Sequence, residues 1–297
     1  MNLTMNNRQE ASRGRWIEVV VFRALVLAAG AAFAASAPEC QGIPVISGQP
    51  PTIRADSGRP LAAVLDGVQR LFLSPVTFEE APYESTEDLV QIPVVTGGGL
   101  KIERSLRSTA PFSVTLGATD TTPNLAVQSV LYAYTNAGLP GVYSPAVRGG
   151  TVDVHPVQVR GTDGSMKDIT PVMSQPVTFP TATRLGRDTL QLIASQIGVQ
   201  SGVEVIVLNV PFWPADTLTV GAAGEPARDV ISDIGAQIGR PISFQCLWEP
   251  NEKRYYLNVT IVAAPVPPGR PAPGGPIFLP MPKLPPSGSP WFNNAPQ

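Results

Sequence analysis

Residues 58–78 have the sequence GRPLAAVLDGVQRLFLSPVTF, an amphipathic helix followed by a short apolar run. Apolar residues recur every three or four positions from Leu61 to Phe72, which is the spacing of a helix with one buried face. Pro60 suits the first helical turn, where its missing N–H removes no hydrogen bond. The stretch therefore predicts a helix over 60–73 and a strand over 76–81.

The same pattern recurs further along the chain. Residues 224–244 (GEPARDVISDIGAQIGRPISF) align without a gap on 58–78, sharing the bracketing Gly-x-Pro and Pro-x-x-Phe and the apolar positions between them. The helix predicted over 185–198 also matches the one predicted over 224–239, including its Gln-Ile-Gly ending. Because glycine, proline and glutamine match as well as the apolar residues, the pattern favours an internal duplication.

A fourth helix is expected over 122–138, with Thr122 as N-cap and Pro123 in the first turn. Combined with the strands that follow the helices, the chain contains two copies of β-α-β-β-α-β-β, at 50–160 and 176–262. The predicted fold class is α+β, with two tandem modules in which small mixed sheets pack with two helices each. The remaining strands are expected around 142–147, 151–159, 203–210, 242–248 and 255–262.

The N-terminus predicts export. Four arginines within residues 1–23 precede the uncharged run ALVLAAGAAFAASA (24–37), which ends in small A-x-A triplets, the pattern of a secretory signal peptide over 1–37. An uncleaved membrane anchor is the alternative, and it would be the chain's contact with a membrane. The expected location is periplasmic or secreted.

Two cysteines, Cys40 and Cys246, would meet an oxidising compartment after export. A disulfide between them is one interpretation. The other is that Cys246, which alternates with Phe244 and Trp248 in a predicted strand, is a small buried apolar residue.

Two segments differ in composition from the modules. Residues 263–297 hold 12 of the chain's 33 prolines and predict a disordered Pro-rich tail, with an extended spacer or docking peptide as alternatives. Residues 83–109, with several acids and the triplet Gly97-Gly98-Gly99, predict a mobile insertion within the first module.

The second module resembles a known family. Val177-Thr178-Phe179-Pro180 and the helix from Thr189 to Val199 look like the opening strand and first helix of the STN module, the short N-terminal domain of secretins and TonB-dependent receptors. Thr217 to Val220, the helix 226–239 and Tyr255 to Val259 continue the pattern. The resemblance implies a periplasmic, non-catalytic, protein-binding module, although in this chain no barrel-like sequence follows residue 262.

Motifs for catalysis and cofactors are sparse. His155 is the single histidine and shares a strand face with Asp153, which allows an Asp–His pair; the favoured interpretation is a surface or hydrogen-bonded structural histidine. Acid pairs such as Glu79-Glu80 and Glu84 with Glu87 are candidates for a glycosidase acid and base, or are a solvated surface. With a net charge of −2 and scattered basic residues, nucleic acid is not an expected partner. We expect no cofactor and no metal.

Aromatic residues gather in the second module, where they form a platform for a partner or fill the core. The chain is therefore expected to be a non-enzymatic interaction or scaffold protein of the bacterial envelope, binding an unknown envelope protein by strand addition at an open sheet edge, placed at strand 255–262. A cell-wall glycan hydrolase and a purely structural spacer are the alternatives. The aromatic candidates are Trp213, Trp248, Tyr255 and Tyr256.

Overall fold

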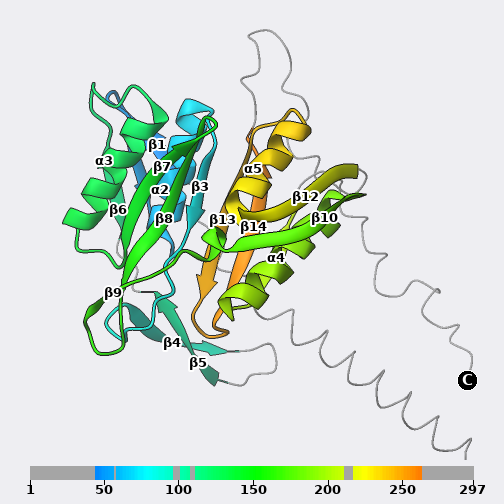
Figure 1. Ribbon diagram of the computed structural model, residues 1–297. Helices are drawn as coiled ribbons and strands as arrows, with labels where there is room; N and C mark the ends of the chain where they lie inside the picture. The colour runs from blue at the N-terminus through cyan, green and yellow to red at the C-terminus, as the bar shows by residue number, and fades with distance from the viewer. Residues whose placement is uncertain (1–43, 57, 96–100, 108–110, 211–216, 263–297) are drawn as a thin grey trace, which may run out of the picture. The chain divides into compact units, whose positions relative to one another are not determined.

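The computed structural model describes residues 44–56, 58–95, 101–107, 111–210 and 217–262 (Figure 1). All the described residues belong to one compact unit, which ends at Val262. Four α-helices lie in these residues, each where a helix was predicted. They are α2 (Pro60–Phe72), α3 (Pro123–Asn136), α4 (Gly186–Ser201) and α5 (Ala227–Gln237), and the 3-10 turn η2 (Val172–Ser174) precedes the second half.

A central mixed sheet runs through the whole unit in the order β11-β14-β13-β3-β8-β7, with β9 beside the end of β8. Its strands are β3 (Val76–Glu79), β7 (Val142–Arg148), β8 (Thr151–Arg160), β9 (Met166–Asp168), β11 (Val205–Asn209), β13 (Ile242–Glu249) and β14 (Arg254–Ile261). The smaller sheets contain β1 (Val45–Ser47), β2 (Thr52–Ala55) and β6 (Phe112–Thr115), then β10 (Pro176–Leu185) with β12 (Thr217–Pro226), and β4 (Leu89–Val95) with β5 (Lys101–Arg107).

The two halves of the unit share one topology. In the first half β3 pairs parallel to β8 and β7 pairs antiparallel to β8. In the second half β11 pairs parallel to β14 and β13 pairs antiparallel to β14. Each half also has an antiparallel ribbon, β2 with β6 and β10 with β12. The halves meet where β13 pairs parallel to β3. The α+β fold class is confirmed.

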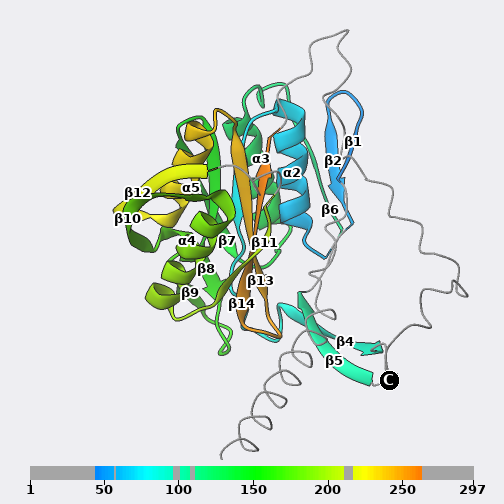
Figure 2. The ribbon, with the colours of Figure 1, turned by 90° about the vertical axis from the view of Figure 1, so that its right-hand side faces the viewer.

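The helices of the two halves cover opposite faces of the central sheet. Figure 2 shows the sheet between α4 and α5 on one side and α2 and α3 on the other. The corresponding strands of the two halves run in opposite directions along the shared sheet. Since a right-handed crossover places its helix on the face set by the strand direction, reversing the strands moves the helices to the other face.

Each helix layer is buried between the central sheet and its own ribbon. α2 contacts β3 on one side and β2 and β6 on the other, and α4 contacts β11, β10 and β12 in the same way. The largest fully buried side chains include Phe78 and Phe244 on the two adjoining strands and Tyr134 on α3. Their rings and the helix leucines, isoleucines and valines form one continuous core across both halves.

The prediction that strand 255–262 forms an open edge of a sheet is wrong. β14 lies between β11 and β13 and is paired on both sides. The sequence alone did not show that the parallel crossover would bring β11 (205–209) to the outer side of β14. Within the described residues, the strands at the ends of the central sheet are β11 and β7.

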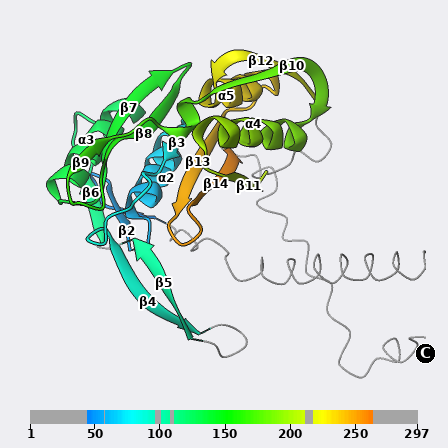
Figure 3. The same cartoon turned by 60° about the horizontal axis from the view of Figure 1, so that its bottom comes forward.

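The region predicted as a mobile insertion contains a β-hairpin. β4 and β5 pair antiparallel from Leu89 with Arg107 to Val95 with Lys101 (Figure 3). The hairpin is attached to the β13–β14 turn, because Asn251 accepts a hydrogen bond from the Ser105 N–H (2.7 Å) and donates one to the Ser105 carbonyl (2.8 Å). Residues 96–100 and 108–110 lie outside the described part of the chain.

The cap of α3 yields a stability prediction. The Thr122 hydroxyl accepts a hydrogen bond from the Leu125 N–H at 3.3 Å, as the sequence predicted. Thr122→Ala should therefore lower the free energy of unfolding by about 1 kcal/mol in urea denaturation. Thr121→Ala, at the exposed position before the cap, is the control and should change it by less than about 0.5 kcal/mol. Equal losses in both variants would contradict the capping role.

Candidate functional site

The seam between the two halves is the parallel pair β3 and β13. Glu79 lies opposite Cys246 in the register, and the Glu80 N–H donates to the Cys246 carbonyl at 2.8 Å. Two consecutive carboxylates, Glu79 at the end of β3 and Glu80 directly after it, thus lie buried at the centre of the sheet. Because successive side chains point to opposite faces, Glu79 and Glu80 enter two different layers.

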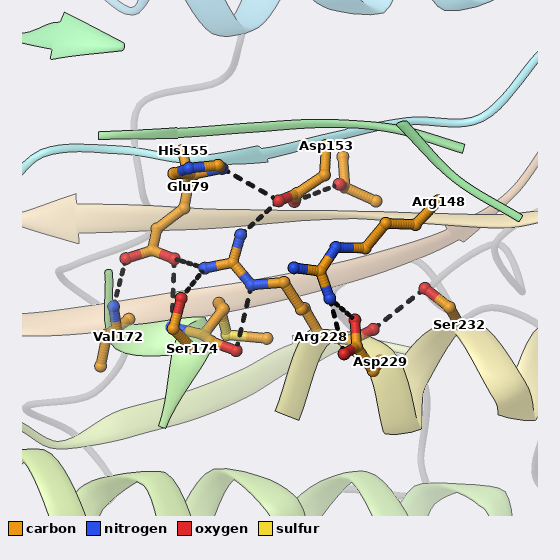
Figure 4. A network of polar contacts seen from close by, with 11 residues as sticks. Glu79, Arg148, Asp153, His155, Val172, Ser174, Arg228, Asp229 and Ser232 are labelled. Atoms are coloured by element: carbon orange, nitrogen blue, oxygen red, sulfur yellow. Dashed lines mark hydrogen bonds and ion pairs between the residues drawn. The ribbon is translucent and has the colours of Figure 1, made fainter. Parts of the chain in front are cut away.

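Glu79 belongs to a buried network around Arg228, which comes from the first turn of α5 (Figure 4). The Arg228 guanidinium forms ion pairs with Asp153 on β8 and with Glu79, at 3.5 Å in the second case. It also donates to the Ser174 hydroxyl, and the backbone N–H groups of Val172 and Met173 donate to the Glu79 carboxylate. One arginine of the second half therefore holds two carboxylates of the first half.

Asp153 has further partners on its own side of the seam. The Thr77 hydroxyl donates to it at 2.8 Å, and His155 Nδ1 lies 3.0 Å from its other oxygen. Asp153 and His155, which share a strand face, are thus paired, and the pair lies inside a buried network of ion pairs and hydrogen bonds. The side chains of Glu79, Asp153 and Arg228 are 1%, 6% and 4% exposed, so water screens their charges little.

The pKa values of Glu79 and Asp153 are shifted in opposite directions. Burial raises the pKa of Glu79 to about 7, against the opposing effects of Arg228 and the two backbone N–H donors. Burial also disfavours the charged form of Asp153, but the hydrogen bond from His155, the Arg228 charge and the hydrogen bond from Thr77 together hold its pKa below 3.8. Near neutral pH, Arg228 is therefore matched by an ionised Asp153 and a partly protonated Glu79.

Glu80 enters the opposite layer and makes a second link between the halves. Its carboxylate pairs with Arg59 at the start of α2 and accepts a hydrogen bond from the Trp248 N–H at 3.0 Å. Arg59 in turn donates to the Trp248 carbonyl at 2.9 Å. Glu249 adds a third link by pairing with Arg104 of the β4–β5 hairpin at 3.2 Å.

A groove of about 710 Å³ opens beside the seam, between the β7–β8 turn and α5. Arg148 and Asp229 form an ion pair across it at 2.6 Å, and both are partly exposed. Asp233 and Arg240 also line it. Because both charge signs are mixed along its walls, the groove does not favour a ligand of one charge.

The other candidate site is the edge of the central sheet at β11, where backbone groups rather than side chains would make the contacts. β11 and β7 each pair with one strand of the central sheet within the described residues. The Tyr255 N–H donates to the Glu204 carbonyl at 2.9 Å, so the backbone groups of Glu204 face β14. Because backbone directions alternate along a strand, the N–H and C=O groups of Val205 and Val207 point away from β14, to the open side of the sheet. The side chain of Leu208 next to them is 44% exposed. This edge can accept the backbone of another strand.

Three of the predicted interaction aromatics are not on the surface. Trp248, Tyr255 and Tyr256 are 7%, 3% and 4% exposed, and the Trp248 and Tyr255 rings pack with centroids 5.0 Å apart. They fill the core because β13 and β14 are inner strands with layers on both faces. Trp213 lies outside the described residues.

The glycosidase candidates separate into two kinds. Glu79 and Glu80 are buried in the seam ion pairs, and neither lines the groove beside α5. Glu84 and Glu87 are exposed, and Glu87 pairs with Arg160 at the surface. The structure therefore does not bring these four acids together around one opening.

Cys246 lies in the middle of β13 and is fully buried, and burial raises the pKa of its thiol well above 9.0. This placement agrees with its interpretation as a small apolar residue. Cys40 lies outside the described residues, so the disulfide between them stays a prediction.

The sequence analysis did not single out Arg59 and Arg228 and did not predict the burial of Glu79 and Glu80, although a signal was present. Arg59 and Arg228 stand at the starts of α2 and α5, where the helix dipole disfavours a positive charge. Glu79 ends a buried strand and Glu80 directly follows it. Basic residues at helix starts, together with acids that extend a buried strand, indicate a buried ion-pair network more strongly than a solvated surface.

Two kinds of feature are absent from the described residues. None of their helices is both long enough and apolar enough to cross a membrane. In the same part of the chain, no group of three histidine, cysteine or acidic side chains is placed to hold a metal ion.

Comparison with known proteins returned no match to a family model, to a curated protein or to a solved structure.

Removing Arg228 tests the seam. Arg228→Leu leaves Glu79 and Asp153 buried without their cation and should lower the free energy of unfolding by about 3–5 kcal/mol in urea denaturation at pH 7. Arg148→Leu is the matched control, because it breaks an exposed pair with α5 and should cost at most about 1 kcal/mol. Similar losses in the two variants would contradict a stabilising role for the buried network.

The raised pKa of Glu79 predicts a pH dependence. The folded state holds a proton on Glu79 up to about pH 7, whereas the unfolded chain releases it near 4.5, so stability should fall as the pH rises through this window. The fall due to Glu79 should be about 3 kcal/mol. Glu79→Gln should lack it, while Asp153, whose pKa is lowered, acts below this range. Urea denaturation across the window measures the difference, and parallel pH profiles would show that Glu79 is not responsible.

Proposed function

We propose that this chain is an exported, non-enzymatic interaction or scaffold protein of the bacterial envelope, which binds a partner protein by strand addition. The observation that carries the proposal is the β11 edge, where Val205 and Val207 present outward backbone groups beside the exposed Leu208. Main-chain hydrogen bonds to such an edge supply affinity, and side chains along it supply specificity.

The seam supports a scaffold role. On one face of the sheet the buried ion pairs of Arg228 join the two halves, and on the other face Arg59 and Glu80 join them through hydrogen bonds to the Trp248 backbone. The β11 edge is therefore part of one extended sheet. A rigid edge loses little conformational freedom on binding, which favours affinity.

The envelope location is supported by the sequence. The pattern over residues 1–37 is that of a signal peptide, and the second half resembles the STN module, which implies a periplasmic protein-binding role. The partner is therefore proposed to be an envelope protein that offers an extended segment or an edge strand.

The hydrolase alternative is weaker. Glu79, with a pKa of about 7, would suit a general acid, but it is fully buried and held by Arg228 and two backbone donors. A substrate would have to break the seam to reach it. Turnover of peptidoglycan by the purified chain would contradict the non-enzymatic proposal.

The proposal is tested by blocking the β11 edge. The full chain and Val207→Pro are used as baits in an envelope extract, and each captured protein is purified and its affinity for both baits is measured. Proline at 207 removes an outward N–H and obstructs the edge, so binding should weaken by about tenfold or more.

Val45→Pro is the matched control, since Val45 is an exposed valine on the short strand β1 of another sheet. It should leave the affinity unchanged. A partner that binds Val207→Pro as tightly as the unaltered chain would show that the β11 edge is not the binding site.

A further inference from the structure

The seam between β3 and β13 shows which kind of strand this fold accepts at an edge, and β11 holds the same place in the second half as β3 in the first. Both strands begin four residues after their helix ends, α2 at Phe72 and α4 at Ser201. Both helices are followed by a residue in the left-handed region, Leu73 (φ 51°) and Gly202 (φ 70°). This makes Phe78 of β3 the counterpart of Val207 of β11.

The equivalence extends across the sheet to the opposite edge of each half. Phe78 lies opposite Val154, which lies opposite Pro145 on β7. In the second half Val207 lies opposite Leu257, which lies opposite Cys246 on β13. Pro145 at the outer edge therefore occupies the position that Cys246 occupies in the seam.

Cys246 uses its backbone to join the halves. Its carbonyl accepts the hydrogen bond from the Glu80 N–H, and in this parallel register its own N–H faces the Phe78 carbonyl. Proline has no N–H, and its ring occupies the space where the donor would be. Pro145 can therefore not make the central bond of the pairing.

The backbone of Pro145 faces the outer edge of the sheet, away from β8. The Val152 N–H donates to the Pro75 carbonyl, away from β7, so Val147 and Val152 do not bond to each other across the hairpin. Backbone directions alternate along a strand, so Pro145, two residues from Val147, also turns its backbone to the open side. Proline within a strand is found at such edges, where it hinders further pairing.

The directions of the edge strands match. β7 runs antiparallel to β8 and therefore antiparallel to β3, and β11 runs antiparallel to β13. Because β3 and β13 are parallel, β7 and β11 run the same way at opposite ends of the sheet. A translated second copy would thus bring its β11 beside β7 in the parallel arrangement of the seam.

We propose that β11 and β7 are complementary edges, which could pair with each other as β3 pairs with β13 in the seam, and that Pro145 blocks the β7 edge. The chain then accepts one parallel strand at β11 but does not join its own copies head to tail. A heterologous contact of this kind, left open, extends into rings or fibres. The inference rests on the proposed function in taking β11 as an accepting edge, and it identifies the strand that β11 fits: a parallel edge strand with a free N–H at the position of Cys246.

The test restores a backbone N–H at position 145 by replacing the proline with valine. Full-length Pro145→Val should form oligomers of increasing size as its concentration is raised, whereas the unaltered chain should not, as measured by size-exclusion chromatography with light scattering. Pro145→Val combined with Val207→Pro has an open β7 and a blocked β11 and should not self-associate. Mixed with the unaltered chain, the double variant should form a one-to-one complex and nothing larger, because each molecule then offers one complementary edge.

Pro156→Val is the matched control, since Pro156 is buried on the inner strand β8 and its replacement opens no edge. Thermal unfolding by circular dichroism verifies that each variant is folded, and Pro145→Thr replaces Pro145→Val if the valine variant fails to fold. A folded variant at position 145 that behaves like the unaltered chain, or oligomers that survive Val207→Pro, would overturn the proposal. If position 145 has no effect but Val207→Pro still abolishes partner binding, the proposed function stands and this inference falls.

Discussion

The arrangement of the two halves depends on the sharing of Arg228 between Glu79 and Asp153. These three charged side chains are almost completely buried, so each needs the others to offset its loss of water. The arginine belongs to α5 and both carboxylates belong to strands of the first half. Any movement of one half against the other would leave buried charges unmatched. This constraint makes the unit ending at Val262 one body although its topology is that of two similar halves.

The seam strands β3 and β13 and the end strands β11 and β7 hold equivalent places in the two halves but carry different residues at the matching positions. At the seam, β13 meets β3, and the two acids at the end of β3, Glu79 and Glu80, reach Arg228 on one face and Arg59 on the other. Since Phe78 corresponds to Val207, the position of Glu79 is taken by Leu208 on β11, and the position of Cys246 is taken by Pro145 on β7. The charge network thus marks the junction between the halves, and in our proposal Leu208 on β11 and Pro145 on β7 distinguish an accepting edge from a closed one. A scaffold that must bind one partner without polymerising has use for this asymmetry.

Much of the fold could be predicted from local signals. Helices were placed to within a few residues because Pro60, Thr122 and Pro123 satisfy helix starts and because apolar spacing marks the buried faces. The candidate site could not be predicted in the same way. Glu79 and Glu80 resemble surface acids until β13 is known to pair with β3, and strand 255–262 resembles an edge until β11 is known to lie beside it. Burial and edge position are properties of the sheet order, which local periodicity does not contain.

The sequence by itself determined the helices, most of the strands, the α+β class and the duplicated pattern, because capping, proline placement and apolar spacing act within a few residues. Tertiary structure alone decided that α2 and α5, whose sequences align, stand on opposite faces of one sheet and at different places in their halves. It also decided that Trp248, Tyr255 and Tyr256 are core residues and that, within the described residues, β11 rather than strand 255–262 lies at an end of the central sheet. The physical reason is that strand pairing joins segments more than a hundred residues apart, as Glu79 and Cys246 show, and the sequence near each of them carries no record of the other.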